Sequence, residues 1–282
     1  MAIHKNYHHQ KINNKFRSPQ VLSNKIKDKT AEGCLWIGGK NPCLVVLKNQ
    51  QRTIEEVAVS VKNFDFIKNF LLENNLNNLS NKIRIVDDGF FDKTFSKDFV
   101  HQGFAARVSK YEDKTQFELL QYLNNITDKK LLPNILILDQ VTDPQNVGAI
   151  VRSAVAFNFN FIVFTQFNAA KESAIMVKAS AGNIEFAKIF IATNLNNLLI
   201  ALKKIGYWCI GLDGNAKHNS KIIADYDNIA LVVGSEGRGI RDLVKKNCDL
   251  LVKISTNQKV ESLNVSVASA IVLNEIYQTK NL

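Results

Sequence analysis

Beyond Pro133 the sequence alternates between short, almost wholly apolar runs and longer segments in which apolar residues recur at helical spacing. Apolar runs without polar alternation are typical of strands that are buried on both faces of a sheet. Strands that are joined through helices run parallel, because a parallel pair needs a long crossover connection. The pattern predicts strands at 135–138, 161–164, 186–191, 207–212, 229–233 and 250–254, and helices at 147–157, 173–181, 195–205 and 263–277.

This alternation predicts an α/β domain over residues 133–282, with a parallel sheet and helices on both faces. The preceding residues show a different pattern. We interpret residues 31–109 as a small α/β domain and the charged, polar residues 110–132 as the linker between the two domains. The helices and strands predicted in these two parts lie at 64–72, 83–86, 104–108 and 117–123.

The net positive charge is concentrated at the N-terminus. The chain has 36 lysines and arginines against 26 aspartates and glutamates, and six of the resulting ten positive charges fall within residues 1–30. A flexible basic arm is therefore predicted there, and such arms bind nucleic acid by neutralising phosphates. An alternative stays open, because asparagine, lysine and isoleucine are abundant along the whole chain, and such a bias can arise without a nucleic-acid partner.

The composition also indicates in which cellular compartment the protein is expected. No apolar run approaches the roughly 18 residues that cross a bilayer, and residues 1–30 contain no apolar signal segment. We therefore expect neither membrane insertion nor export. The four cysteines lack the paired spacing of a zinc site or a disulfide framework, so we expect reduced thiols and no bound metal in a cytoplasmic protein.

Three segments place polar residues or glycines directly after an apolar strand, at the edge where open α/β sheets bind their ligands. The first covers residues 139–148, with Asn146 as a candidate helix cap and Gly148 as a point where another backbone can approach. Arg152 follows in the same predicted helix and could border the same cleft. The alternative is a capped helix with a solvated arginine.

The second segment, residues 232–240, is a strand that leads into a glycine-rich loop. The close spacing of its glycines indicates that something approaches this backbone. The pattern matches neither the P-loop nor the dinucleotide-binding fingerprint. Glu236 in the loop would repel an anion, so a neutral or cationic ligand suits the loop better.

The third segment, residues 254–270, runs from the end of a strand through a loop into the last predicted helix. Ser262 is a natural cap for that helix, which is its ordinary explanation. Asn264 is predicted inside the first turn, where asparagine is a mediocre helix former, and it is therefore a candidate ligand contact. The small residues that follow allow the helix to pack closely on another backbone.

In this order and at these separations, the three segments resemble the three motifs of the SpoU (TrmH) family of RNA 2′-O-methyltransferases in the SPOUT superfamily. The front part is similar to the longer members of that family, which carry an RNA-binding domain of the L7Ae/L30e type. The resemblance is carried by 143–152, 234–239 and 262–268 for the motifs, by 178–182 and 211–214 between them, and by 36–39 and 101–103 in the front part.

The resemblance implies a SPOUT domain with a C-terminal trefoil knot and an S-adenosylmethionine pocket built on the knot. It also implies a homodimer that acts on RNA. A guanosine of 23S rRNA is favoured over a guanosine of tRNA as the methylation target. By position, the implied cofactor contacts are Gly234, Ile254 and Leu263. The implied catalytic residues are Asn146, Arg152, Glu236, Ser262 and Asn264.

One departure from the family pattern concerns the cofactor loop. Family members usually have Ile-Pro-Met where this chain has Ile254, Ser255 and Thr256. Loss of the proline frees the loop backbone, which affects cofactor affinity more than the type of reaction. The alternatives to the 23S rRNA enzyme are a tRNA guanosine 2′-O-methyltransferase and a non-catalytic rRNA-binding assembly factor with the same fold.

The resemblance assigns activation of the ribose hydroxyl to Arg152. An arginine that acts as a neutral base near pH 7 requires about 7.5 kcal/mol. A cationic Arg152 that holds the substrate phosphate and stabilises developing negative charge requires no such cost. Asn146 and Asn264 would orient the ribose or the cofactor carboxylate by hydrogen bonds, which an amide can do without a change of charge.

Deletion of residues 1–30 tests the predicted basic arm. Loss of its phosphate contacts should weaken RNA binding and flatten the dependence of the binding constant on salt, because fewer counterions are released. Titration of labelled rRNA at several salt concentrations measures both quantities. An unchanged salt dependence would show that the arm makes no phosphate contacts.

Overall fold

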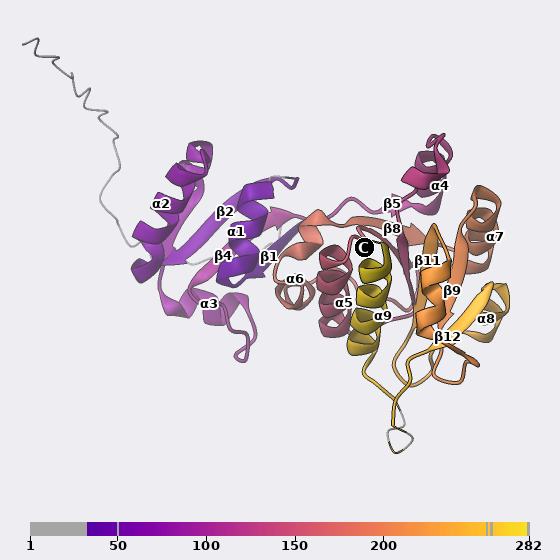
Figure 1. Cartoon of the computed structure of the whole chain (residues 1–282). Coiled ribbons are helices and arrows are strands. Elements are labelled where there is room, and N and C mark those ends of the chain that lie inside the picture. Colours follow the sequence, from indigo (N-terminus) through magenta and orange to yellow (C-terminus); the bar gives the residue numbers. More distant parts are fainter. Residues whose placement is uncertain (1–32, 50, 258, 260–261, 281–282) are drawn as a thin grey trace, which may run out of the picture.

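The larger of two sheets contains eight strands in the computed structural model, which describes residues 33–49, 51–257, 259 and 262–280 (Figure 1). Every neighbouring pair in this sheet is parallel, as the sequence predicts. In spatial order the strands are β10 (His218–Asn219), β12 (Leu250–Lys253), β9 (Trp208–Leu212), β11 (Ile229–Gly234), β6 (Ile135–Asp139), β7 (Phe161–Thr165), β8 (Lys188–Ala192) and β5 (Lys114–Thr115).

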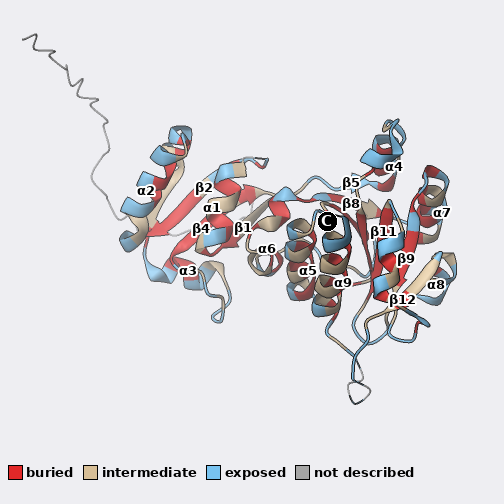
Figure 2. Ribbon diagram, viewed as in Figure 1, coloured by how far each residue is buried: buried red, intermediate tan, exposed pale blue. Residues whose placement is uncertain are grey.

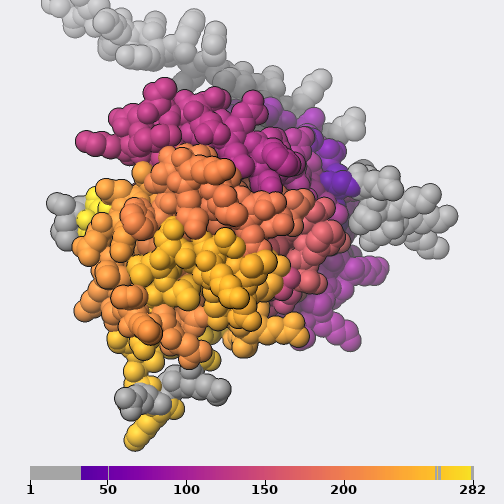
Figure 3. All heavy atoms as spheres, turned by 90° about the vertical axis from the view of Figure 1, so that its right-hand side faces the viewer, coloured from indigo at the N-terminus to yellow at the C-terminus, as the bar shows by residue number. Residues whose placement is uncertain are grey.

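Residues of each central strand alternate between two apolar layers. Leu136 and Leu138 belong to one buried cluster, while Ile135 and Ile137 belong to the other, and Figure 2 shows these strands as buried. The predicted α/β fold class with helices on both faces is therefore confirmed, and the trefoil knot stays a prediction. The first layer contains α5 (Pro144–Ala156), α6 (Ala174–Ala179) and α9 (Val265–Lys280), and the second contains α4 (Gln116–Asn124), α7 (Leu195–Ile205) and α8 (Asp242–Asn247). Figure 3 shows the second layer from outside, with α4 in magenta above α7 and α8 in orange and gold.

The residues before the larger sheet form the small α/β domain that the sequence predicts. Its sheet has the order β1-β4-β2-β3, in which β4 is antiparallel to β1 and β2, and β2 is parallel to β3. The predicted basic arm at 1–30 lies outside the described residues. The elements are β1 (Cys34–Gly38), α1 (Lys40–Asn49), β2 (Ile54–Ser60), α2 (Phe64–Glu73), β3 (Ile83–Val86), α3 (Asp88–Thr94) and β4 (Phe104–Ser109).

The predicted linker, residues 110–132, contains ordered elements that pack on the larger sheet. β5 pairs with β8 at the edge of that sheet, and α4 packs on α7. Thr115 and Glu118 form a capping box at the start of α4, in which the Glu118 carboxylate accepts from Thr115 N at 2.7 Å. The stretch between the two sheets is therefore short and covers residues 110–113.

Two of the differences between predicted and observed element starts have a clear local cause. The start of α5 is Pro144, three residues earlier than predicted, because the Asp143 carboxylate accepts from Gln145 N at 2.9 Å and from Asn146 N at 3.4 Å. Asp143 is therefore the cap, and the expectation that Asn146 caps this helix is wrong. The strand predicted at 186–191 begins at Lys188 because a 3₁₀ turn precedes it. The 3₁₀ turns are η1 (Val61–Asn63), η2 (Asn77–Lys82), η3 (Lys129–Leu131), η4 (Asn183–Phe186) and η5 (Ser220–Asp225).

The cysteines in the described part of the chain are free thiols. Burial raises the pKa of Cys209 and of Cys248 to about 12, and burial also raises the pKa of Cys43. Thiols of this kind stay protonated and unreactive near neutral pH. Across the described residues, no helix is long and apolar enough to cross a membrane, and no group of three or more metal-binding side chains gathers.

Gly148 provides a test of how closely α5 packs on α6. A Cβ there would lie 2.4 Å from the Met176 carbonyl oxygen and 2.6 Å from the Ala179 Cβ, so the helices would have to move apart. Gly148→Ala should lower the free energy of unfolding by about 1 to 3 kcal/mol, despite the better helix propensity of alanine. Gly214→Ala is the control, because nothing lies within 4 Å of a Cβ at that position. Urea denaturation measures both variants, and equal stability of the two would contradict the close packing.

Candidate active site

The carboxyl ends of β6 and β11 lie side by side in the middle of the larger sheet. Asp139, the last residue of β6, is in register with Gly234, the last residue of β11. The first two segments singled out in the sequence therefore leave the sheet at the same edge, as expected for parallel strands.

A buried carboxylate fastens the second segment to the first. The Asp139 side chain is fully buried, and its Oδ1 accepts from Arg241 Nε at 2.8 Å and lies 2.7 Å from Arg241 Nη2. Its Oδ2 accepts from Arg241 N at 2.9 Å. A carboxylate is buried in ionised form only with such compensation. Asp139 opens the first segment singled out in the sequence, but its burial and its pairing with Arg241 are not predicted there, although a charged residue at the end of an apolar strand is a signal for such a buried ion pair.

The glycine-rich loop folds back on its own backbone. Ser235 and Gly239 form an antiparallel bridge, with one N to O distance of 3.2 Å and one of 2.8 Å. A Cβ on Gly234 would lie 2.0 Å from the carbonyl carbon of Gly239. The close approach that the glycine spacing indicates is therefore made by the chain itself.

Side chains from all three segments meet in one hydrogen-bonded cluster, which we call the polar triad. Asn146 donates from Nδ2 to Glu236 Oε2 at 3.2 Å. Asn264 donates from Nδ2 to Asn146 Oδ1 at 3.0 Å and to Glu236 Oε1 at 3.3 Å. The sequence predicts all three as site residues, and the fold brings them into direct contact.

Asn264 also determines where the last helix begins. Its Oδ1 accepts from Ser266 N at 2.9 Å, from Ser266 Oγ at 2.6 Å and from Val267 N at 3.4 Å, so Asn264 caps α9. Asn264 thus precedes α9 and does not lie in its first turn. Ser262, the cap expected from the sequence, is exposed and lies two residues before the actual cap. That expectation is wrong because the asparagine oxygen already satisfies the free amides of the helix.

The polar triad lines a cavity of about 470 Å³, which it shares with Asp143, Gln145, Ala149 and Ser266. Arg152 lies about one turn beyond Ala149 on α5, and its side chain is exposed. In the part of the chain that the structure describes, no carboxylate is close enough to form an ion pair with Arg152. Arg152 is therefore an exposed cation on the helix that carries Asn146, and it is not among the described residues that line the cavity.

Two of the three predicted cofactor contacts lie at strand ends, and the third lies before the last helix. Gly234 ends β11, Ile254 directly follows β12, and Leu263 precedes α9. Both β11 and β12 pair with β9, so their ends flank the same strand. Ile254 and Leu263 are half-buried. The loop after Ile254 is tied to β10, because Asn219 Nδ2 donates to Ser255 Oγ at 2.6 Å. This hydrogen bond restrains the backbone that the absence of a proline leaves freer.

A second polar surface lies on the small domain, at the loops before α1 and β4. Lys40 N donates to Gln102 Oε1 at 3.1 Å, and the Lys40 ammonium lies 3.8 Å from the centroid of the Phe66 ring. The Phe66 side chain is partly exposed, and the side chains of Val61 in η1 and of Val100 in the loop before β4 are exposed. An exposed aromatic ring beside a lysine can stack on a nucleic-acid base and neutralise a phosphate.

Two family models match the chain. The model for the SpoU rRNA Methylase family matches residues 133–274. The model for RNA 2′-O ribose methyltransferase substrate binding matches residues 36–114.

Curated relatives match over much of the chain. An uncharacterized tRNA/rRNA methyltransferase of Borreliella burgdorferi is 37% identical over 185 residues, which cover 64% of this chain and 81% of that protein. The Bacillus subtilis protein YacO, named as a TrmH family tRNA/rRNA methyltransferase, is 38% identical over 181 residues, which cover 64% of this chain and 72% of that protein.

Solved structures share the fold over both domains. The SpoU methyltransferase AviRb of Streptomyces viridochromogenes, in complex with the cofactor AdoMet, has a TM-score of 0.68 at 17% identity and covers 88% of this chain and 91% of its own. The AdoMet-bound rRNA methyltransferase of Sinorhizobium meliloti has a TM-score of 0.66 at 17% identity and covers 87% of both chains.

Substitutions at Asn264 and Ser262 test which residue caps α9. Asn264→Ala should lower the free energy of unfolding by about 1 kcal/mol, and Asn264→Ser should lower it much less, because serine also caps helices. Ser262→Ala is the matched control and should change stability by less than about 0.5 kcal/mol. Urea denaturation of the three variants measures these differences. An equal loss in Ser262→Ala and Asn264→Ala would contradict the assignment of the cap.

Proposed function

Because this chain belongs to the SpoU rRNA Methylase family, we propose that it transfers a methyl group from S-adenosylmethionine to a ribose 2′-hydroxyl of RNA. The observation that carries the proposal is the polar triad, in which three segments far apart in sequence converge on one cavity. Polar side chains that converge at the carboxyl ends of parallel strands are the usual arrangement of a ligand site.

The predicted cofactor contacts and their neighbours at the strand ends have side chains that suit S-adenosylmethionine. Leu212 ends β9, Ile254 directly follows β12 and Leu263 precedes α9, and all three are half-buried apolar side chains. Gly214 has open space where a Cβ would stand. Such apolar side chains suit an adenine ring, and backbone beside a glycine can approach a ligand closely. Ile254, Leu263 and the backbone of Gly234 would hold the cofactor. When bound, S-adenosylmethionine supplies an electrophilic methyl group on its sulfonium sulfur.

Arg152 acts as a cation in this proposal. Its exposed guanidinium has no carboxylate partner among the described residues, so it is available for a substrate phosphate. A fixed guanidinium binds phosphate oxygens through two parallel hydrogen bonds and stabilises negative charge that develops on a nearby oxygen. Arg152 would therefore position the ribose and stabilise its 2′-oxygen as the proton leaves.

The polar triad orients the ribose. Glu236 accepts from both asparagine amides, which fixes the direction of each amide group. A carboxylate has more lone pairs than these two hydrogen bonds use. Glu236 can therefore also accept from a ribose hydroxyl, while Ser262 on the adjoining loop contacts the substrate. These roles require in-line placement of the 2′-oxygen, which a preorganised set of hydrogen bonds provides.

The small domain provides the RNA contact in this proposal. Its match to a substrate-binding model and the exposed Phe66 ring beside Lys40 support an RNA partner. A guanosine of 23S rRNA, the substrate of the enzyme RlmB that the sequence resembles, is the favoured target, because a separate RNA-binding domain accompanies the methyltransferase domain. A tRNA guanosine is the alternative. With either target, the proposal includes a cytoplasmic location of the protein.

The proposal includes a C-terminal trefoil knot and a homodimer. The packed helices α5 and α9 support a dimer, because they carry exposed groups that a second copy could cover. Arg152 on α5 is an exposed cation, and the apolar side chain of Val267 on α9 is 49% exposed. An active site completed by a second copy would use Arg152 in the same cavity as the partner's triad.

Arg152→Ala tests the proposed reaction. Loss of the guanidinium should lower single-turnover methyl transfer by about a hundredfold or more, because one stabilising group is removed from the transition state. Binding of S-adenosylmethionine, measured by calorimetry, should stay within about threefold of the unmodified protein. Transfer of a labelled methyl group to rRNA transcripts is the measurement.

Lys204→Ala is the matched control, because Lys204 is an exposed cation on α7, in the opposite helix layer. It should leave methyl transfer unchanged. If Arg152→Ala retained activity within about tenfold, the role of Arg152 would be wrong. If the unmodified protein bound no S-adenosylmethionine, the enzymatic proposal itself would fail and a non-catalytic RNA-binding protein would remain.

A further inference from the structure

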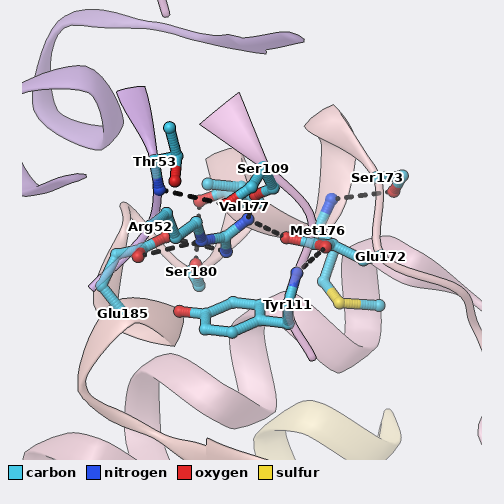
Figure 4. Close-up of polar contacts among 10 residues, drawn as sticks. All are labelled: Arg52, Thr53, Ser109, Tyr111, Glu172, Ser173, Met176, Val177, Ser180 and Glu185. Atoms are coloured by element: carbon cyan, nitrogen blue, oxygen red, sulfur yellow. Dashed lines mark hydrogen bonds and ion pairs between the residues drawn. The ribbon is translucent and has the colours of Figure 1, made fainter. Parts of the chain in front are cut away.

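A buried arginine of the small domain reaches into the methyltransferase domain. Arg52 lies between α1 and β2 and is only 5% exposed (Figure 4). Its guanidinium forms an ion pair with Glu172, which follows β7. The guanidinium also contacts Glu185 in η4, with Nε to Oε2 at 3.1 Å and Nη2 to Oε1 at 2.8 Å. One cation therefore contacts two carboxylates of the other domain.

The short connection between the sheets is part of the same cluster. The guanidinium of Arg52 lies 3.5 Å from the centroid of the Tyr111 ring, and Tyr111 N donates to Glu172 Oε2 at 3.1 Å. Arg52 Nη1 also donates to the carbonyl oxygen of Ser109, the last residue of β4, at 3.3 Å. Figure 4 shows the guanidinium between the two carboxylates and above the tyrosine ring. We call Arg52, Glu172, Glu185 and Tyr111 the interdomain clamp.

Close packing continues beside the clamp. Asn49 Nδ2 donates to the Glu185 carbonyl oxygen at 2.6 Å. At Gly182 a Cβ would lie 2.9 Å from the Val45 Cβ and 3.0 Å from the Pro42 Cα, so α1 rests directly on this backbone. One apolar cluster also includes residues of both domains. The two domains therefore contact each other beside the clamp through a hydrogen bond, a close backbone approach and a shared apolar cluster.

The charges make the clamp sensitive to loss of the arginine. Burial raises the pKa of Glu185, while the neighbouring Arg52 lowers it, so the buried carboxylate depends on this guanidinium. Removal of one partner from a buried ion pair leaves the remaining charge uncompensated. Two domains joined by a short linker usually move relative to each other. The contacts of Arg52 with Glu172 and Glu185 instead favour one fixed arrangement of these two domains.

We propose that Arg52 is a positioning residue that holds the RNA-binding domain at one fixed placement relative to the active site, so that the protein selects folded RNA. A rigid pair of sites favours an RNA whose docking element and target ribose are already held at the matching separation. A short single strand can engage the active site alone and gains nothing from the clamp. The inference rests on the proposed function for the identity of the substrate.

The placement of the domains can be measured without any activity. Spin labels on cysteines introduced at Glu73 in α2 and Lys204 in α7, both exposed, report the distance between the domains once Cys34 and Cys248 are replaced by serine. The chain with an intact clamp should give one narrow distance distribution. Arg52→Ala should broaden the distribution, and Arg84→Ala should leave it narrow, because the Arg84 ion pair with Glu56 lies within the small domain.

Kinetics test the consequence for substrate choice. With a folded rRNA fragment that contains the methylated nucleotide, Arg52→Ala should raise KM by about tenfold or more, with kcat within about threefold. With a short oligonucleotide around the same nucleotide, both constants should stay within about threefold of the unmodified protein. A purely structural role of Arg52 would lower activity on both RNAs alike.

The milder variant Glu172→Gln covers the case in which Arg52→Ala does not fold, since it removes one ion pair and leaves Glu185 in place. Glu172→Gln should also broaden the distance distribution and raise KM for the folded RNA, as expected for Arg52→Ala. A narrow distribution in both variants, or an equal loss on folded and short RNA, would overturn the proposal. If the unmodified protein methylated neither RNA, the proposed function would fail, and the spin-label distances would still decide whether the clamp fixes the domains.

Discussion

A carboxylate with no exposure to solvent is the constraint on which the candidate active site depends. Asp139 ends the central strand β6, and burial of its charge is compensated by Arg241, which contacts it through the backbone amide and the guanidinium. These contacts hold the far end of the glycine-rich loop at the edge of the sheet. The near end is held at Gly234, where the loop backbone passes too close for any side chain. Glu236 is therefore presented to the two asparagines by a loop that is fixed at both ends.

The sequence predicts the elements of this fold well because each depends on local pattern. Nearly continuous apolar runs exist in a chain of this length only where strands are buried on both faces, and the parallel sheet follows from the helices between them. The polar triad was also predictable, since each member follows the carboxyl end of a strand and such ends gather at one edge. The convergence of Asn146, Glu236 and Asn264 therefore follows from the topology of the parallel sheet, and predicting it requires no knowledge of individual long-range contacts.

Other features could not be predicted from the local sequence pattern, because two or more residues of similar chemistry could fill the same role. Asp143 and Asn146 are both good helix caps, and the proline at the next position after Asp143 decides between them. Ser262 and Asn264 present the same ambiguity two residues apart. The interdomain clamp is harder still to predict from the sequence, because Arg52 is one of many basic residues and its carboxylate partners lie 120 and 133 residues away in the chain. Only tertiary packing distinguishes it from a solvated arginine.

The two domains and the active site are connected through α6. The backbone of α6 rests on α5 at Gly148, on the helix that carries Asn146 and Arg152. Just after α6 the chain reaches Gly182, where α1 of the small domain touches the backbone, and Lys178 within α6 lies 4.4 Å from the Phe99 ring of that domain. Close-packed helices transmit displacement because they lack space to absorb it. A small domain that moved on its linker would therefore disturb the helix that positions Asn146 and Arg152, so fixing the domains also preserves the geometry of the site.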